Sequence, residues 1–419
     1  MHPRVRGAVA IAALMTPVMT LAPSRAHAQS DPEPADPAKP TGAAERATEP
    51  APPPAEPPPQ HFMKQPPEAV EEPVGPAFSW KPFGFLRMQY IAVQNDPNVA
   101  FVGRDDGFEL QNARLGAQGR LGDRVGFTIA IDGAVDERAQ VNSPDGKLKV
   151  GLRDAYADMV MSGQAVVHAG YFLPWVDPEA LVPDTAREFV DRPLESRGMR
   201  ATEGWQTPGL PPGRSLGASI RLDPASLLGA PVPVTAPRVG FEVAIQNGAD
   251  EFASNNDNDK PALSASAVLR MPHDGFVVAA VRWNPRSVGD LPFRQDETDI
   301  QGAFGVHIVA GPVSLGGGLV LQHTTYESTN GPSQDAYGGH AQIMFKVPAA
   351  LPFALGYRFG ILDPSNLIIT DQVMEHTVGA VLGVPSYRMR LQLQLTHVQE
   401  QAARDLSNDR AQLAAEIAL

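Results

Sequence analysis

A long segment, residues 173–213, carries both carboxylates and guanidiniums. Opposed acidic and basic groups around a common passage create a transverse field that sorts solutes by charge and dipole. On a solvated surface loop the same residues would form ordinary salt bridges, so both interpretations are open from these residues alone. The charged residues are Asp177, Glu179, Asp184, Arg187, Glu188, Asp191, Arg192, Glu195, Arg197, Arg200 and Glu203.

Groups suited to catalysis or metal binding are sparse, with ten histidines and no cysteine in the chain. His307 and His340 are expected on one face of their strands and His323 on the other, which disfavours a shared metal site. A structural role for His323 is favoured over a base that activates a nearby hydroxyl. Residues 255–259 carry oxygen ligands of the kind calcium prefers, although a polar loop tip is the simpler interpretation. We therefore predict no enzymatic activity, no cofactor, no metal site and no nucleic-acid partner.

The elements that must position these charges are strands, because apolar residues recur at every second position. Residues 386–397 are the clearest case, and a strand with this period has one apolar and one polar face. About sixteen such segments follow one another between residues 78 and 419. Residues 316–318, three glycines within one of them, are expected to allow close packing or a bend. In residues 386–397 the apolar face carries Leu391, Leu393 and Leu395, and the polar face carries Arg390, Gln392 and Gln394.

The connections between the expected strands alternate between short turns and long polar loops. Residues 121–123, 272–275, 311–312 and 384–386 are tight turns, and longer loops lie between them. Outer-membrane barrels alternate short periplasmic turns with long external loops, and closure removes the sheet edges that lipid cannot satisfy. The sequence therefore predicts an all-β fold, a transmembrane antiparallel β-barrel of about 16 strands. Residues 223–237 are an exception, because they are long on the expected periplasmic side.

The first 77 residues have a different composition. Residues 1–28 combine Arg4 and Arg6, an apolar stretch and an Ala-x-Ala site, which predicts a Sec-type signal peptide. Residues 29–77 are rich in proline and are expected to be a disordered periplasmic segment. That segment could contact the cell wall, or it could be a leader with no partner. Residues 78–419 form the expected barrel domain, placed in the outer membrane and in contact with its lipid.

Several short motifs, in order, resemble the phosphate-selective porin O and P family. They are residues 107–119 (GFELQNARLGAQG), 152–158 (LRDAYAD), 169–175 (AGYFLPW) and 195–198 (ESRG). The resemblance implies a sixteen-stranded, trimeric anion channel that is constricted by a loop folded into the lumen. It makes residues 173–213, the third external loop, the expected constriction. The chain departs from the family in ending on Leu419 instead of an aromatic residue, and the family's basic anion site cannot be assigned to individual residues.

Alternation also predicts which charged residues of the strands face the lumen. The inward arginines would be Arg87, Arg114, Arg120, Arg221, Arg282, Arg358, Arg388 and Arg390. The inward carboxylates would be Glu109, Asp132, Asp154, Asp158, Glu242, Asp299, Glu375 and Glu416. A network of cross-strand ion pairs is favoured over a ladder of arginines that attracts anions.

The expected function is a porin, a water-filled channel for passive diffusion of small hydrophilic solutes or ions, with anions such as phosphate among the candidates. A homotrimer is expected from the resemblance. The alternative is a structural barrel that anchors the membrane through the proline-rich segment.

Overall fold

All described residues of the computed structural model belong to the unit from Glu71 to Leu419. The expected signal peptide and proline-rich segment lie outside them, as do residues 223–237 and 255–257. The structure describes residues 78–103, 106–133, 150–162, 165–200, 202–222, 238–248, 258–271, 273, 275–288, 294–327, 332–348, 352–401 and 406–419.

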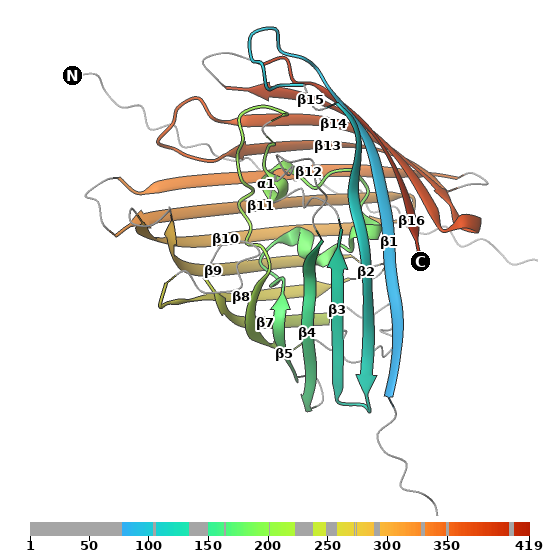
Figure 1. Ribbon diagram of the computed structural model, residues 1–419, viewed down its shortest axis with the longest axis vertical. Helices are drawn as coiled ribbons and strands as arrows, with labels where there is room; N and C mark the ends of the chain where they lie inside the picture. The colour runs from blue at the N-terminus through green and yellow to red at the C-terminus, as the bar shows by residue number, and fades with distance from the viewer. Residues whose placement is uncertain are drawn as a thin grey trace, which may run out of the picture. The chain divides into compact units, whose positions relative to one another are not determined.

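Sixteen antiparallel strands form one closed barrel, in which each strand pairs with its neighbours in sequence and β1 pairs with β16 (Figure 1). The prediction of a sixteen-stranded barrel is therefore confirmed. The strands are β1 (Phe78–Val93), β2 (Gly107–Leu121), β3 (Val125–Asp132), β4 (Gly151–Ser162), β5 (Ala165–Phe172), β6 (Ser215–Leu222), β7 (Arg238–Asn247), β8 (Pro261–Arg270), β9 (Phe276–Val288), β10 (Gln295–Ala310), β11 (Val313–Tyr326), β12 (Gln334–Val347), β13 (Phe353–Asp363), β14 (Val373–Val384), β15 (Met389–Glu400) and β16 (Arg410–Ala418).

The start of β1, the end of β16 and the tightest turns all lie at one end of the barrel, which we call the turn end. Phe78 pairs with Leu121 there, and the amide of Leu419 donates to the carbonyl of Gly84. The opposite end, which carries the longer connections, is the loop end. In outer-membrane barrels the short turns face the periplasm.

The two faces of the wall differ in polarity as the alternation predicts. Leu393 and Leu395 are 46% and 51% exposed on the outer face, whereas Gln392 and Gln394 are 2% and 0% exposed on the inner face. The register predicted for this strand is therefore confirmed. Leu419 is also exposed, in step with the outward side chains before it. An apolar outer face is stable only against lipid or another protein.

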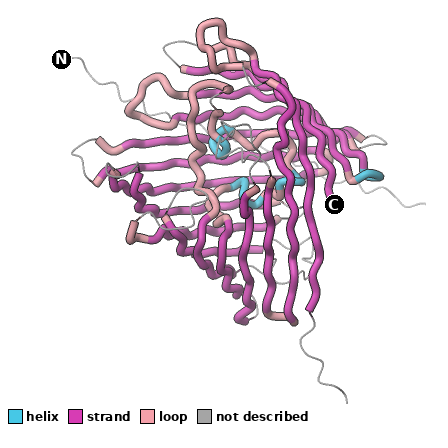
Figure 2. Tube along the Cα trace, in the orientation of Figure 1, coloured by secondary structure: helices cyan, strands magenta, loops and turns pink. Residues whose placement is uncertain are grey.

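The helical segments of the described residues are short. Three of them, η1 (Pro178–Leu181), η2 (Asp184–Ala186) and α1 (Leu194–Arg197), lie between β5 and β6, and η3 (Pro385–Tyr387) lies in a turn. Figure 2 shows the first three together within the barrel. None of the helices in the described part of the chain is long and apolar enough to cross a membrane.

Candidate functional site

The connection between β5 and β6, residues 173–214, lies inside the barrel and contacts opposite parts of its wall. We call it the inner loop. In Figure 1 it is the green segment with α1, between the front strands and the strands behind. Leu194 of α1 packs in a buried cluster with Leu362 and Val398 of the wall. Val176 packs in a second cluster with residues of β9, β10 and β11. Apolar contacts therefore hold the inner loop to the wall at more than one place.

Glycines of the wall leave room for the inner loop. A Cβ atom on Gly305 would lie 2.3 Å from Cβ of Pro178, and one on Gly338 would lie 2.5 Å from Cβ of Glu195. A Cβ atom on Gly379 would lie 2.8 Å from the ring of Phe189. Such distances are far below van der Waals contact, so larger residues at these positions would displace the loop.

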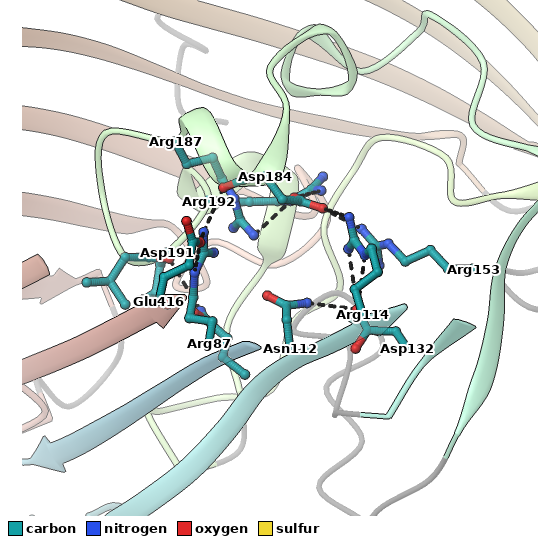
Figure 3. Close-up of polar contacts among 12 residues, drawn as sticks. Arg87, Asn112, Arg114, Asp132, Arg153, Asp184, Arg187, Asp191, Arg192 and Glu416 are labelled. Carbon is teal, nitrogen blue, oxygen red and sulfur yellow. Dashed lines mark hydrogen bonds and ion pairs between the residues drawn. The ribbon is translucent and has the colours of Figure 1, made fainter. Parts of the chain in front are cut away.

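Asp184 of η2 is the centre of a buried arginine cluster. Its carboxylate pairs with Arg153 of β4 at 3.3 Å, with Arg187 and Arg192 of the loop at 3.0 Å each, and with Arg114 of β2. Figure 3 shows two of these guanidiniums on each side of the carboxylate. Burial by itself would raise the pKa of Asp184, but the four arginines together hold that pKa well below its usual value.

The same cluster reaches the strands that close the barrel. The guanidinium of Arg87 donates to the Asp184 carbonyl at 2.7 Å and pairs with Glu416. Glu416 also accepts from Arg390 at 2.9 Å. The turn-end half of the inner loop is thereby tied to β1, β15 and β16. We call the connected group the turn-side cluster, and it comprises Arg87, Arg114, Asp132, Arg153, Asp177, Asp184, Arg187, Arg192, Arg390 and Glu416.

Near the loop end, four side chains form a closed ring of ion pairs, which we call the loop-side ring. Arg197 donates to Glu203 at 2.7 Å and to Glu375 at 2.6 Å, and Arg410 donates to the same two carboxylates at 2.8 Å each. All four side chains are 2% exposed or less. Burial would raise the pKa of Glu203, but Arg197, Arg410 and Arg200 lower it to about 2. The ring joins the inner loop to β14 and β16.

Two inward histidines contact carboxylates of the inner loop. Nδ1 of His340 lies 2.5 Å from Glu195, and its Nε2 lies 3.9 Å from Glu179. His307 lies 4.0 Å from Glu188. His323 faces outward, as predicted, and contacts Asp335 at 2.6 Å. The three histidines therefore do not meet.

Most residues predicted to face the lumen are found there. Arg282 and Arg358 are 7% and 3% exposed, and Arg221 pairs with Glu242. Arg120 lies on the same side of β2 as Arg114 and is half-buried. The prediction for Arg388 requires correction: it is exposed in the turn before β15, with a φ of 50°, because β15 begins one residue later.

Sequence reasoning missed Arg153, Arg214 and Arg410. Arg153 reaches the lumen because the register between β3 and β4 shifts at this position, and a bulge changes which side chains point inward. Arg214 precedes β6 and donates to Asp154 at 2.9 Å. Arg410 begins β16, and strict alternation back from Glu416 would have placed it inside.

No metal centre is found among the described residues, in which no three His, Asp or Glu side chains are grouped as a metal ion requires. Most of the segment considered for calcium lies outside these residues. The contacts of the inner loop are ion pairs and hydrogen bonds to the wall. Their chemistry suits an electrostatic filter in a water-filled passage.

Comparisons with known families and structures relate the chain to porins. The sequence model of the phosphate-selective porin O and P family matches residues 86–223, which hold half of β1, the strands β2–β6 and the whole inner loop. No curated protein matches the chain in sequence.

Solved porins share the barrel. The anion-selective porin of Comamonas acidovorans has a TM-score of 0.57 at 14% identity, covering 82% of this chain and 100% of its own. The channel DcaP of Acinetobacter baumannii has a TM-score of 0.53 at 16% identity, covering 82% and 97%. OmpT of Vibrio cholerae in its trimer form has a TM-score of 0.53 at 9% identity, covering 82% and 100%. Residues 86–223 are thus similar to the phosphate-selective porin O and P family, and the barrel has the fold of outer-membrane porins.

Proposed function

We propose that the protein is an outer-membrane porin, a channel for passive diffusion, that the inner loop forms its constriction and that the constriction favours anions. The observation that carries the proposal is the arginine cluster around Asp184, because one carboxylate there meets four guanidiniums. Guanidiniums stay charged at any physiological pH and offer fixed donors to an anion. A passage lined by such groups concentrates anions and repels cations.

The net charges of the turn-side cluster and the loop-side ring support this preference. Within the described residues, the turn-side cluster holds six guanidiniums and four carboxylates, which leaves two positive charges in excess. The loop-side ring holds two of each and is neutral. Within these two groups, the excess of positive charge therefore lies toward the turn end. An ion that crosses the barrel would meet its main electrostatic site there.

The reversal potential of the purified porin in a salt gradient tests the proposal. We expect the wild type to prefer chloride over potassium, and Arg153→Gln to lower that preference. Lys260→Gln is the matched control, because Lys260 forms an exposed ion pair with Glu327 and its side chain is 51% exposed. A wild type that prefers potassium would overturn the anion preference. A well-folded wild type without conductance would favour the alternative of an anchoring barrel.

We also propose that the porin is a homotrimer in which the short strands face a second copy. The strands β3, β5 and β6 have eight residues each, whereas β10 has sixteen. A tilted strand needs about 9–11 residues to cross the hydrocarbon core. Ile129 and Ile220 expose apolar side chains on this short wall. Native mass spectrometry should give the mass of three chains, and Ile220→Arg should release monomers; a monomeric wild type would contradict the proposal.

The N-terminal segments complete the proposal. We assign residues 1–28 to a cleaved Sec signal and residues 29–77 to a segment that contacts the cell wall, because of their composition. Sequencing of the protein from outer membranes should find Gln29 as the first residue. Cosedimentation with isolated cell walls should depend on residues 29–77. If a protein that lacks them sediments equally, the segment has no such partner.

A further inference from the structure

A cavity of about 640 Å³ lies between the inner loop and the wall at the turn end, and we call it the wall cavity. Leu181, Val182 and Phe189 of the loop line one side, and Phe276 of β9 and Val309 of β10 line the other. Cavities of roughly 300–1,000 Å³ that combine apolar walls with a few charged groups are typical sites for small molecules. The wall cavity has both properties.

The apolar lining is held in place by packing. Phe276 is 6% exposed and belongs to a buried cluster with Trp175 and Val278, against which Leu181 and Val182 pack. The ring of Phe276 lies 5.8 Å from the ring of His307. The cavity therefore presents a fixed aromatic surface, against which a flat apolar group could stack.

Four cationic side chains line the cavity: Arg187, Arg270, Lys346 and Arg358. The guanidinium of Arg358 donates to the carbonyls of Asp191 and Arg192 at 3.0 and 3.3 Å, and it lies 4.6 Å from the centre of the Phe189 ring. Lys346 of β12 also lines the cavity and is exposed. An anionic group in the cavity would thus meet positive charge beside an apolar wall.

The lining also holds three carboxylates, Glu179, Glu188 and Asp191, each of which contacts a polar group of the wall. Glu188 accepts from the hydroxyl of Ser314 and from the amide of Gln342 at 3.2 Å, and it lies 4.0 Å from His307. Burial would raise the pKa of Glu188, but His307, Ser314 and Lys346 together lower it, so the carboxylate stays charged and bound to the wall. Lys346 is exposed and can meet an anionic solute directly, while the buried Arg358 adds positive charge behind the Phe189 ring.

We infer that the wall cavity binds small anions with a flat apolar body, the class of aromatic carboxylates, on their way through the channel. The inference rests on the proposed channel function and adds a solute class to it. Inorganic anions would meet the same cations but would gain nothing from Phe276 and Val309. A solute with both groups would be retained longer, because burial of apolar surface adds to the attraction between charges.

Single-channel chloride current with benzoate or acetate added at the turn end tests the inference. Benzoate should reduce the current at concentrations at which acetate, with the same charge but no ring, has no effect. Lys346→Gln should raise the half-blocking concentration of benzoate by about fivefold. Phe276→Leu should raise it as well, because the aromatic surface is lost. Lys260→Gln, the same substitution on an exposed residue far from the cavity, should leave it unchanged.

The outcomes separate the two proposals. Equal effects of benzoate and acetate, or equal effects of the two lysine substitutions, would overturn the wall-cavity inference while the channel stands. A folded wild type without current would overturn the channel function instead. In that case the quenching of tryptophan fluorescence by benzoate in detergent decides whether the cavity binds, because Trp175 packs against Phe276. Absence of saturable quenching would then reject the inference too.

Discussion

Glu203→Gln should detach the loop-end half of the inner loop without unfolding the barrel. The Glu203 carboxylate is 1% exposed and is bound by Arg197 and Arg410. Loss of one partner of a buried ion pair costs about 3–5 kcal/mol, because the remaining charges stay desolvated. The pKa of Glu203, lowered to about 2 by its arginines, is shifted in the direction that this cost requires.

A cost of about 3 kcal/mol raises the population of the detached loop by about 100-fold. The barrel strands should be unaffected, since their backbone hydrogen bonds do not involve Glu203. Amide hydrogen exchange of the porin in detergent measures the opening of the loop and the opening of the strands. The amides of Met199, Thr207 and Leu210 are bonded within the inner loop at 2.8, 3.0 and 2.8 Å and should exchange about 100-fold faster.

Glu327→Gln is the matched control for this prediction. Glu327 pairs with Lys260, its side chain is 45% exposed, and such surface pairs contribute about 0–1 kcal/mol. Its effect on the three loop amides should be negligible. The reasoning fails if Glu203→Gln leaves those amides protected, or if it accelerates exchange in the strands as much as in the loop.

Three further predictions concern the outer face, acid and the loop charges. Leu393→Arg should destabilise the assembled barrel by about 2–4 kcal/mol because Leu393 faces lipid, whereas Tyr387→Arg in an exposed turn should not. The heat stability of the folded protein in lipid vesicles measures both effects. Equal stability of the two variants would mean that the strand does not lie in lipid at this depth. The pKa of Glu203 is lower in the folded porin than in the unfolded chain, so the Glu203 carboxylate stabilises the inner loop fully above about pH 4.5 and loses this effect as the pH falls toward about 2. Hydrogen exchange of the loop amides, compared at matched intrinsic rates, should therefore increase in that interval. Protection unchanged down to pH 2 would contradict this. Joint neutralisation of Arg187, Arg192, Arg197 and Arg200 should shift the reversal potential toward cations. An unchanged potential would place these four side chains away from the ion path.

The strands could be predicted from the sequence because their period of two is a local property. Leu393 and Gln392 alternate wherever the strand lies, and the fold places them as expected. The closing pair of β1 and β16 also follows, because an open edge cannot exist in lipid.

The partners of the inner-loop charges could not be predicted, because they depend on distant parts of the chain. Arg197 and Glu375 are 178 residues apart, and their contact depends on how deeply the loop enters the barrel. The bulge at Arg153 reverses an orientation that strict alternation assigns. The close packing predicted for residues 316–318 is found at Gly318, where a Cβ atom would lie 2.9 Å from His340. Gly305, Gly338 and Gly379, which contact the inner loop, do not lie in a run of three glycines that would have drawn attention to them.

The claim that the inner loop lines the conducting passage is tested most directly by one cysteine. The chain has no native cysteine, so Ala186→Cys, at an exposed position of the loop that lines the wall cavity, would be the sole thiol. A bulky thiol reagent added during single-channel recording should lower the conductance in a discrete step. Tyr387→Cys, at a turn position that is 72% exposed, should be labelled without such a step. Complete labelling of Ala186→Cys, verified by mass, with an unchanged conductance would show that the loop does not line the passage.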